Sequence, residues 1–338
     1  MSGRRSELLQ RLLLIALAVV LVGAVALDWR RMQPVLGRAN WRVLPAAIVF
    51  SLVSYVCSGS GFAIISRTFG VPVATRRLFL VGFVTMTVNN LITLVGAAGY
   101  GVSAALLKRP EVRLRDVLAA SVFNSYAHFF IGTTFLPLSL VYVVAGGRMP
   151  RAAQTGMTAI VSLALVLAVT VNLAVFSRTF RAGLFRFLSR AARFFVRRDP
   201  SNAFARFDST FTEGMARLKA KPARLAGLFA LIAADWTTCI AALWFCFAAL
   251  GSSPHAGVVA SGFFIGIAAG AASMLPGGMG VQEGSMAGVY ALLGIPFRVG
   301  LLASILFRAV YYFLPFVLGL VIYWSVLVRA RAPASPDN

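Results

Sequence analysis

Acidic residues, histidines and cysteines are scarce in this sequence. Its 338 residues include 10 Asp and Glu against 32 Lys and Arg, together with two histidines and three cysteines. Cys57, Cys239 and Cys246 all fall within apolar runs, and we expect them to be small packing residues. His128 and His255 form no metal-ligand motif with them. The sequence therefore gives no support to a metalloenzyme.

Signatures of covalent catalysis are also missing. The sequence contains no Ser-His-acid arrangement, no phosphate-binding glycine loop followed by Lys, and no motif for nucleotide hydrolysis. We therefore expect a protein that is not an enzyme and that holds no cofactor. Any transport by such a protein would have to be ion-coupled or downhill.

Long apolar runs dominate what is present. Hydrophobic residues make up 59% of the chain and charged residues 12%. Several runs approach or exceed the roughly 20 residues that cross a bilayer as a helix. The sequence therefore predicts an all-α polytopic membrane protein, with a single integral membrane domain over residues 1–332 and a flexible tail over 333–338.

We expect about six crossing helices and two re-entrant hairpins made of broken helices. The first run follows three arginines and lacks a cleavage site, so it is interpreted as a retained helix or signal anchor. The predicted crossings are Leu12–Leu27, Val43–Ile65, Val117–Ala145, Ala152–Phe176, Arg224–Leu250 and Gly300–Val328, and the broken runs are Leu78–Leu107 and Gly257–Leu293.

The net charge of +22 lies in the loops between the apolar runs. This placement favours cytoplasmic retention of loops and contact with anionic lipid headgroups, and we expect no nucleic-acid partner. The segment 177–221 carries eleven Arg or Lys residues with apolar residues at helical spacing, which predicts a basic amphipathic cytoplasmic linker. The positive-inside rule places both termini in the cytoplasm, and we expect the bacterial inner membrane as the location.

The run from Met274 to Glu283 organises the second half of the chain. Pro276 cannot continue a helix, and Gly277, Gly278 and Gly280 free the backbone to turn. Broken backbone at membrane depth requires protein or a water-filled cavity around it, which indicates a binding site. Glu283 then opens the next helical stretch. The alternative interpretation is a simple hairpin turn with a capping Glu.

The first half contains a similar break, at Asn89-Asn90 and Gly96–Gly101, which predicts either a re-entrant hairpin or one kinked crossing. Gly82-Phe83 precedes this break as Gly262-Phe263 precedes the second one. We interpret residues of about 43–145 and 224–328 as an inverted repeat, a pattern typical of transporters with a site near the midplane.

Ionisable residues in membrane spans are costly and mark candidate functional sites. By helix length, His128, Asp235, Arg308 and Glu283 lie near the midplane, and Asn124 can join them. We expect an ion pair of Arg308 with Glu283 or with Asp235. The functional hypothesis is a polar cavity for a charged or zwitterionic headgroup; the alternative is a buried ion pair that only fixes helix register.

The C-terminal motifs occur in a recognisable order. Leu275-Pro-Gly-Gly-Met-Gly-Val-Gln-Glu283 is followed by Leu293-Gly-Ile-Pro296, by Phe307-Arg308, and by Tyr311-Tyr-Phe-Leu-Pro315. These segments resemble the C-terminal signature of the lysylphosphatidylglycerol synthase transmembrane region family, flippase-like membrane proteins related to the flippase half of the multiple peptide resistance factor. The first half departs from that pattern: many members have Pro-Gly-x-x-Gly-Glu followed by Arg, whereas this chain has Val95-Gly-Ala-Ala-Gly-Tyr100 and Ser103.

The resemblance implies translocation of a membrane lipid of the phospholipid, polyprenyl-linked or hopanoid class. No soluble transferase segment is recognised, so lysyl transfer is not expected. In this interpretation Glu283 and Arg308 contact the headgroup or gate the cavity. The second hypothesis is an accessory protein that scaffolds a lipid-biosynthesis enzyme without transporting. The sequence does not choose the lipid or the oligomeric state.

Overall fold

The structure, a computed structural model, describes residues 29–91, 97–145, 201–273 and 275–324, and scattered positions between 155 and 186. All regular secondary structure within these residues is helical. Three helical stretches are long and apolar enough to cross a membrane, and they coincide with three of the predicted crossings: Trp41–Thr68, Pro222–Ala249 and Phe297–Ile322. The predicted crossing 12–27, most of 152–176, most of the linker before residue 201 and the tail 333–338 lie outside the described residues.

The first half begins with a short helix, α2 (Trp29–Gly37), in the predicted connector before the second crossing, followed by the short turn η1 (Trp41–Val43). The long helix α3 (Leu44–Thr68) comes next, and a shorter pair follows it, α4 (Thr75–Leu91) and α5 (Ala97–Leu106). The last helix of this half is α6 (Leu114–Ala145).

The second half repeats this order. After α9 (Ser201–Lys219), the long helix α10 (Pro222–Ala249) is followed by a shorter pair, α11 (Ala256–Ala272) and α12 (Val281–Leu292), with the turn η2 (Pro276–Gly278) between them. The final stretch consists of α13 (Phe297–Arg308), the π-helical segment η3 (Ala309–Phe313) and α14 (Leu314–Ile322).

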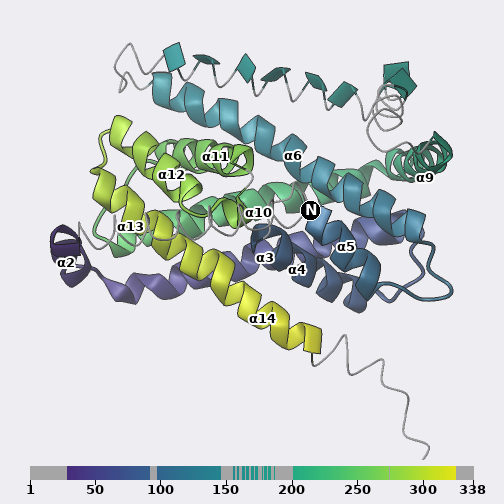
Figure 1. Cartoon of the computed structure of the whole chain (residues 1–338), viewed down its shortest axis with the longest axis horizontal. Coiled ribbons are helices and arrows are strands. Elements are labelled where there is room, and N and C mark those ends of the chain that lie inside the picture. The colour runs from purple at the N-terminus through teal and green to yellow at the C-terminus, as the bar shows by residue number, and fades with distance from the viewer. Residues whose placement is uncertain are drawn as a thin grey trace, which may run out of the picture.

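The packing of the helices is symmetrical between the halves. Helices α3 and α10 run side by side through the middle of the molecule (Figure 1). The first helix of each short pair packs against the last stretch of the opposite half, α4 against α14 and α11 against α6. Buried serines and glycines of α3 allow this helix to approach α10 and α4 closely. Gly61 faces Leu228 of α10, and Gly59 faces Phe79 of α4.

Glycines also set the packing within the second short pair. A Cβ atom on Gly262 would overlap the ring of Tyr290, and one on Gly266 would overlap Met286, so α11 and α12 pack in direct contact. The phenol of Tyr290 is buried there and donates a hydrogen bond to the carbonyl of Val259 at 3.0 Å. These contacts belong to the largest apolar cluster among the described residues, which includes Phe307, Tyr311 and Tyr312 beside the candidate site.

The described end of the basic linker is helical, as the sequence predicts. In α9 the residues Phe211, Met215 and Leu218 recur at helical spacing, and all three are buried. They pack with Phe69 and Phe123, from the loop after α3 and from α6. This helix is therefore attached to the membrane domain.

Candidate functional site

The turn between α11 and α12 adopts a backbone that favours glycine. Gly277, Gly278 and Gly280 have φ angles of 61°, 58° and 82°, in the left-handed region that side chains with a Cβ rarely adopt. The N–H of Gly280 donates a hydrogen bond to Oε2 of Glu283 at 2.7 Å, which satisfies one free donor at the start of α12. The predicted capping role of Glu283 therefore exists, but it occupies only one carboxylate oxygen.

The other oxygen of Glu283 accepts a hydrogen bond from Nε of Arg308, and the two residues form an ion pair between α12 and α13. Nη2 of Arg308 also donates to the carbonyl of Gly277 at 3.0 Å and to Oε1 of Gln282 at 3.2 Å. Arg308 and Glu283 are 8% and 4% exposed, so the charges are almost fully removed from solvent. Of the two partners that the sequence left open for Arg308, the structure selects Glu283.

Tyr312 completes this group of residues, which we call the Arg308 cluster. The guanidinium carbon of Arg308 lies 4.8 Å from the centre of the Tyr312 ring, a cation–π geometry. The hydroxyl of Tyr312 accepts a hydrogen bond from Nε2 of Gln282 at 3.0 Å. The Arg308 cluster therefore comprises Arg308, Glu283, Gln282, Gly277 and Tyr312, and it holds one cation and one anion beside freed backbone.

The helix that carries Arg308 is itself interrupted. Pro315 has no N–H and so leaves the carbonyl of Tyr311 without its usual helical partner. The hydroxyl of Tyr55 on α3 donates to that carbonyl at 2.9 Å. A side chain from the long helix of the first half thus satisfies the backbone defect in the last helix of the second half.

A second carbonyl is freed one residue earlier. The N–H of Leu314 bonds to the carbonyl of Ala309, five residues back, which produces the π-helical turn. The carbonyl of Val310 instead accepts a hydrogen bond from the hydroxyl of Ser51 at 3.2 Å. The widened turn is therefore held open by two side chains of α3.

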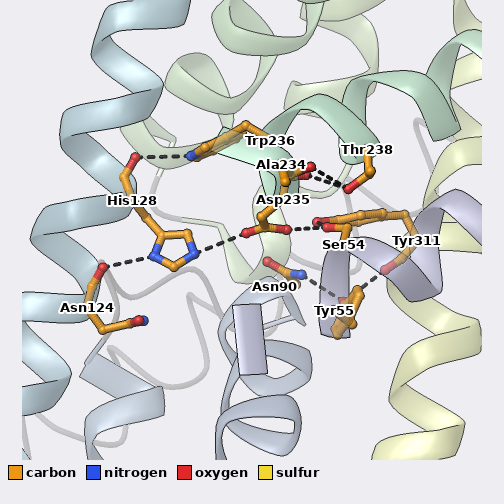
Figure 2. Close-up of polar contacts among 10 residues, drawn as sticks. All are labelled: Ser54, Tyr55, Asn90, Asn124, His128, Ala234, Asp235, Trp236, Thr238 and Tyr311. Carbon is orange, nitrogen blue, oxygen red and sulfur yellow. Dashed lines mark hydrogen bonds and ion pairs between the residues drawn. The ribbon is translucent and has the colours of Figure 1, made fainter. Parts of the chain in front are cut away.

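A second polar group is centred on Asp235, in the middle of α10 (Figure 2). Nε2 of His128 lies 3.1 Å from Oδ2 of Asp235, and the hydroxyl of Ser54 donates to Oδ1. The hydroxyls of Ser54 and Tyr311 are 2.7 Å apart. Nδ1 of His128 lies 2.9 Å from the backbone carbonyl of Asn124. We call His128, Asp235, Ser54 and Tyr311 the Asp235 cluster.

Further hydrogen bonds hold His128, and Tyr55 next to Ser54, in place. The indole N–H of Trp236 donates to the carbonyl of His128 at 3.2 Å, and the amide of Asn90 donates to the hydroxyl of Tyr55 at 2.8 Å (Figure 2). The side-chain oxygen of Asn124 is buried and has no hydrogen-bond partner in the structure. Asn124 therefore contributes its backbone carbonyl to the cluster, and its side chain does not reach the other members.

The two clusters meet at the tips of the two short helix pairs. A Cβ on Gly277 would lie 3.0 Å from the carbonyl oxygen of Leu91, at the end of α4, and 3.5 Å from that of Asn90. Tyr311 and Tyr312 are consecutive residues of η3, one in each cluster, and their ring centroids are 5.7 Å apart. The end of α4 therefore lies against the turn η2, with both polar clusters beside them.

The predicted site residues divide between these groups. Gly277, Gly280, Glu283 and Arg308 come together in or beside the Arg308 cluster, whereas His128 and Asp235 belong to the other. Gly278 packs against Gly270 of α11, and Pro276 begins η2.

Sequence reasoning missed five contributors: Ser54, Tyr55, Gln282, Tyr311 and Tyr312. A usable signal existed for the tyrosines, since Tyr311 and Tyr312 follow Arg308 by one helical turn and precede Pro315. Ser54 and Tyr55 lie in a run of small residues on α3 and are indistinguishable there from packing positions. Their role becomes visible only through contacts 256 to 257 residues away in the sequence.

Fold and site together define a helical membrane protein whose two halves each contain an interrupted helix pair, with charged residues buried beside the interruptions. The chain belongs to the family described as lysylphosphatidylglycerol synthase TM region, which it matches over residues 10–319. The family expected from the C-terminal motifs is therefore confirmed.

One relative has been described from Methanothermobacter thermautotrophicus, where it is named UPF0104 membrane protein. It is 26% identical over 263 residues, which cover 72% of this chain and 72% of the relative. The similarity therefore extends over most of both proteins.

Proposed function

We propose that this protein moves a lipid across the membrane by alternating access, as a flippase-like transporter. The observation that carries the proposal is the ion pair between Arg308 and Glu283, buried beside the freed backbone of η2. Helices crossing a bilayer tolerate broken backbone and charges where these are buried in protein or line a water-filled cavity, and charges at this depth commonly mark a substrate or ion pathway. The family is that of a lipid-synthase membrane region, which supports a lipid as the substrate.

The depth of the site supports this role. Arg308 lies 11 residues after Phe297 and 14 residues before Ile322, the ends of one apolar stretch. At about 1.5 Å per residue, these distances are about 16 and 21 Å, which places Arg308 well inside a hydrocarbon core of about 30 Å. We interpret the pairs α4–α5 and α11–α12 as re-entrant hairpins of an inverted repeat, with residues 43–145 and 224–328 as its halves. The symmetrical packing of the halves supports that interpretation.

A groove near one end of α3 and α10 offers a place for a lipid to enter. It has a volume of about 870 Å³, and its walls include Ala63, Ile64, Val71 and Leu231. Two arginines, Arg67 and Arg224, also line it. Apolar walls with two cations suit a lipid that carries a phosphate or another anionic headgroup.

In this mechanism the headgroup competes for the ion pair. An anionic group of the headgroup takes the place of Glu283 beside Arg308. Glu283 then keeps only its hydrogen bond from the N–H of Gly280. The three glycines around η2 supply the backbone freedom for the hairpin to move. No bond is made or broken, so the protein acts as a transporter rather than an enzyme. Its expected location is the bacterial inner membrane, with both termini in the cytoplasm.

Reconstitution in proteoliposomes tests the proposal. Labelled lipids with anionic, zwitterionic and neutral headgroups are followed between leaflets with native protein and with Glu283→Gln and Arg308→Ala variants. We expect movement of at least one lipid class, lost in both variants and retained in Glu213→Gln, whose carboxylate is exposed on α9. Folded protein that moves none of these lipids would contradict the proposal and favour the accessory role, in which a lipid-biosynthesis enzyme copurifies with it.

A further inference from the structure

The Asp235 cluster is separate from the ion pair to which the proposed function assigns the headgroup. Asp235 lies 13 residues from the start of α10 and 14 from its end, which is about 20 Å from either end at the rise of an α-helix. It is 2% exposed, and the side chain of His128 is 14% exposed. Burial of a titratable pair at this depth is energetically costly, which marks the pair as a candidate functional site.

The hydrogen bonds of the cluster show where its protons lie. A backbone carbonyl can only accept, so the contact with the Asn124 carbonyl places a proton on Nδ1 of His128. Nε2 of a neutral ring would then be an acceptor, and it lies 3.1 Å from an oxygen of Asp235. Two acceptors at that distance repel each other. One further proton must therefore lie between His128 and Asp235, on either atom.

Donors also reach the other side of Asp235. The single hydroxyl proton of Ser54 is directed to Oδ1, so the short contact between the Ser54 and Tyr311 hydroxyls requires Tyr311 to donate. The chain of donors runs from Tyr311 through Ser54 to Asp235 and meets the shared proton from His128. No Arg or Lys in the described ranges contacts Asp235. Among the described residues, the proton shared with His128 is thus the only positive charge in contact with Asp235.

We propose that His128 and Asp235 form the binding site for a proton that is coupled to lipid movement. When the proton is bound, the pair is neutral and the contact between α6 and α10 is closed. When it leaves, His128 is neutral, Asp235 carries a negative charge, and the two acceptors separate. Because α6 belongs to the first half and α10 to the second, proton release loosens the contact between the halves.

The same chain connects the proton site to the headgroup site. Tyr311 donates to Ser54, and its neighbour Tyr312 contacts Gln282 and Arg308. Both tyrosines lie on the widened turn η3, so a change in the Ser54–Tyr311 contact moves the side chain that covers Arg308. The other titratable groups on which the charge of Asp235 acts are Tyr55 and Cys57 on α3, Cys239 on α10, and Tyr311 itself.

The proposal rests on lipid translocation, so the first experiment measures coupling in the same proteoliposomes. The membrane potential is held at zero, and a pH difference of about 1 unit is imposed in each direction. If one proton moves with each lipid, this gradient drives about tenfold accumulation of lipid in one leaflet. We expect that accumulation with native protein and with Thr237→Val, an exposed neighbour on α10, and no accumulation with Asp235→Asn or His128→Gln.

If the native protein moves lipid but the pH difference causes no accumulation, the proton proposal is overturned and the proposed function remains intact. If no lipid moves at all, the proposed function fails, and a second measurement decides about the proton site. The chain contains two histidines, so a His255→Asn variant with ¹⁵N-labelled histidine gives ring signals from His128 alone.

We expect the labelled Nδ1 to remain protonated and Nε2 to gain and lose its proton as the pH is scanned between about 5 and 9. We also expect Ser54→Ala to change the Nε2 signal, because it removes a donor from Asp235. A ring with an unprotonated Nδ1, or a ring whose signals do not change with pH, overturns the assignment of the proton site.

Discussion

Replacement of the buried ion pair separates its contribution to stability from its contribution to transport. In Glu283→Gln, the two oxygens that face Nε of Arg308 and the N–H of Gly280 become one oxygen and one NH₂ group. Whichever way the amide turns, a donor faces a donor. Arg308 also keeps its charge without a carboxylate partner, beside the carbonyl of Gly277 and the amide oxygen of Gln282.

Removal of one partner from a buried pair costs about 3–5 kcal/mol. At about 2.1 cal/mol/K per residue, the unfolding entropy of 338 residues is about 0.7 kcal/mol/K, so a loss of 1 kcal/mol lowers the melting temperature by about 1.4 °C. Each single variant should therefore melt about 4–7 °C below the native protein. The double variant Glu283→Gln/Arg308→Met removes both charges and keeps most of the apolar stem. We expect it to melt above either single variant, although Gly277 and Gln282 lose a donor.

The melting temperatures of Glu283→Gln, Arg308→Met and the double variant are measured by thermal unfolding in detergent. The exposed pair Glu213→Gln/Arg217→Met is the control. The control pair lies on the surface of α9 with its closest charged atoms 4.0 Å apart, and its loss should leave the melting temperature unchanged. Lipid movement should be absent from the single variants and from the more stable double variant. If the two losses of stability simply add in the double variant, the two charges do not stabilise one another, and this interpretation of the cluster is wrong.

Three further variants test other parts of the structure. Tyr55→Phe removes the donor to the freed carbonyl of Tyr311, so we expect a loss of about 1–3 kcal/mol by thermal unfolding; an unchanged melting temperature would show that the carbonyl has another partner. Gly262→Ala should separate α11 from α12 and lower the melting temperature by several degrees, whereas Gly288→Ala, whose Cβ meets open space, should not; equal effects would contradict the packing. Arg224→Ala should reduce binding of vesicles that contain anionic lipid, measured by cosedimentation, and undiminished binding would exclude the groove.

The sequence was sufficient for the helical class, for three of the crossings and for the break around Pro276–Gly280. Those features follow from apolar length and from Pro and Gly, which act locally and can be identified without knowledge of neighbours. The positions predicted for the break in the first half, Asn89-Asn90 and Ala97–Gly101, instead lie within helices α4 and α5. The sequence predicted an ion pair for Arg308 and narrowed its partner to two candidates. The choice between Glu283 and Asp235 depends on how α12, α13 and α10 pack, which no local pattern contains.

The remaining site residues could not be predicted because their function depends on backbone defects elsewhere. Tyr55 matters because Pro315 frees a carbonyl on another helix, and Ser51 matters because the same helix widens at Val310. Neither residue has an unusual neighbour in its own segment. Asn124 lies beside the Asp235 cluster, but it contacts His128 through its backbone carbonyl rather than through the side chain that the sequence singled out.

The two halves of the proposed repeat differ in charge at equivalent places, and the difference bears on mechanism. After the break in the second half, Glu283 pairs with Arg308 of the next helix. After the break in the first half, Ser103 of α5 forms a hydrogen bond of 3.0 Å with Ser121 of α6, and both hydroxyls are buried. A neutral hydroxyl pair offers no charge for an anionic or zwitterionic headgroup, so in the proposed mechanism the charges beside the breaks come from the second half. The first half then contributes the contacts that its partner needs, since α3 satisfies the widened turn below Arg308 and α6 supplies His128 to Asp235. Transport in the proposed mechanism would accordingly arise from a hairpin that carries a buried ion pair moving against a half that holds neutral hydroxyls at the equivalent place, with the shared proton where α6 and α10 meet.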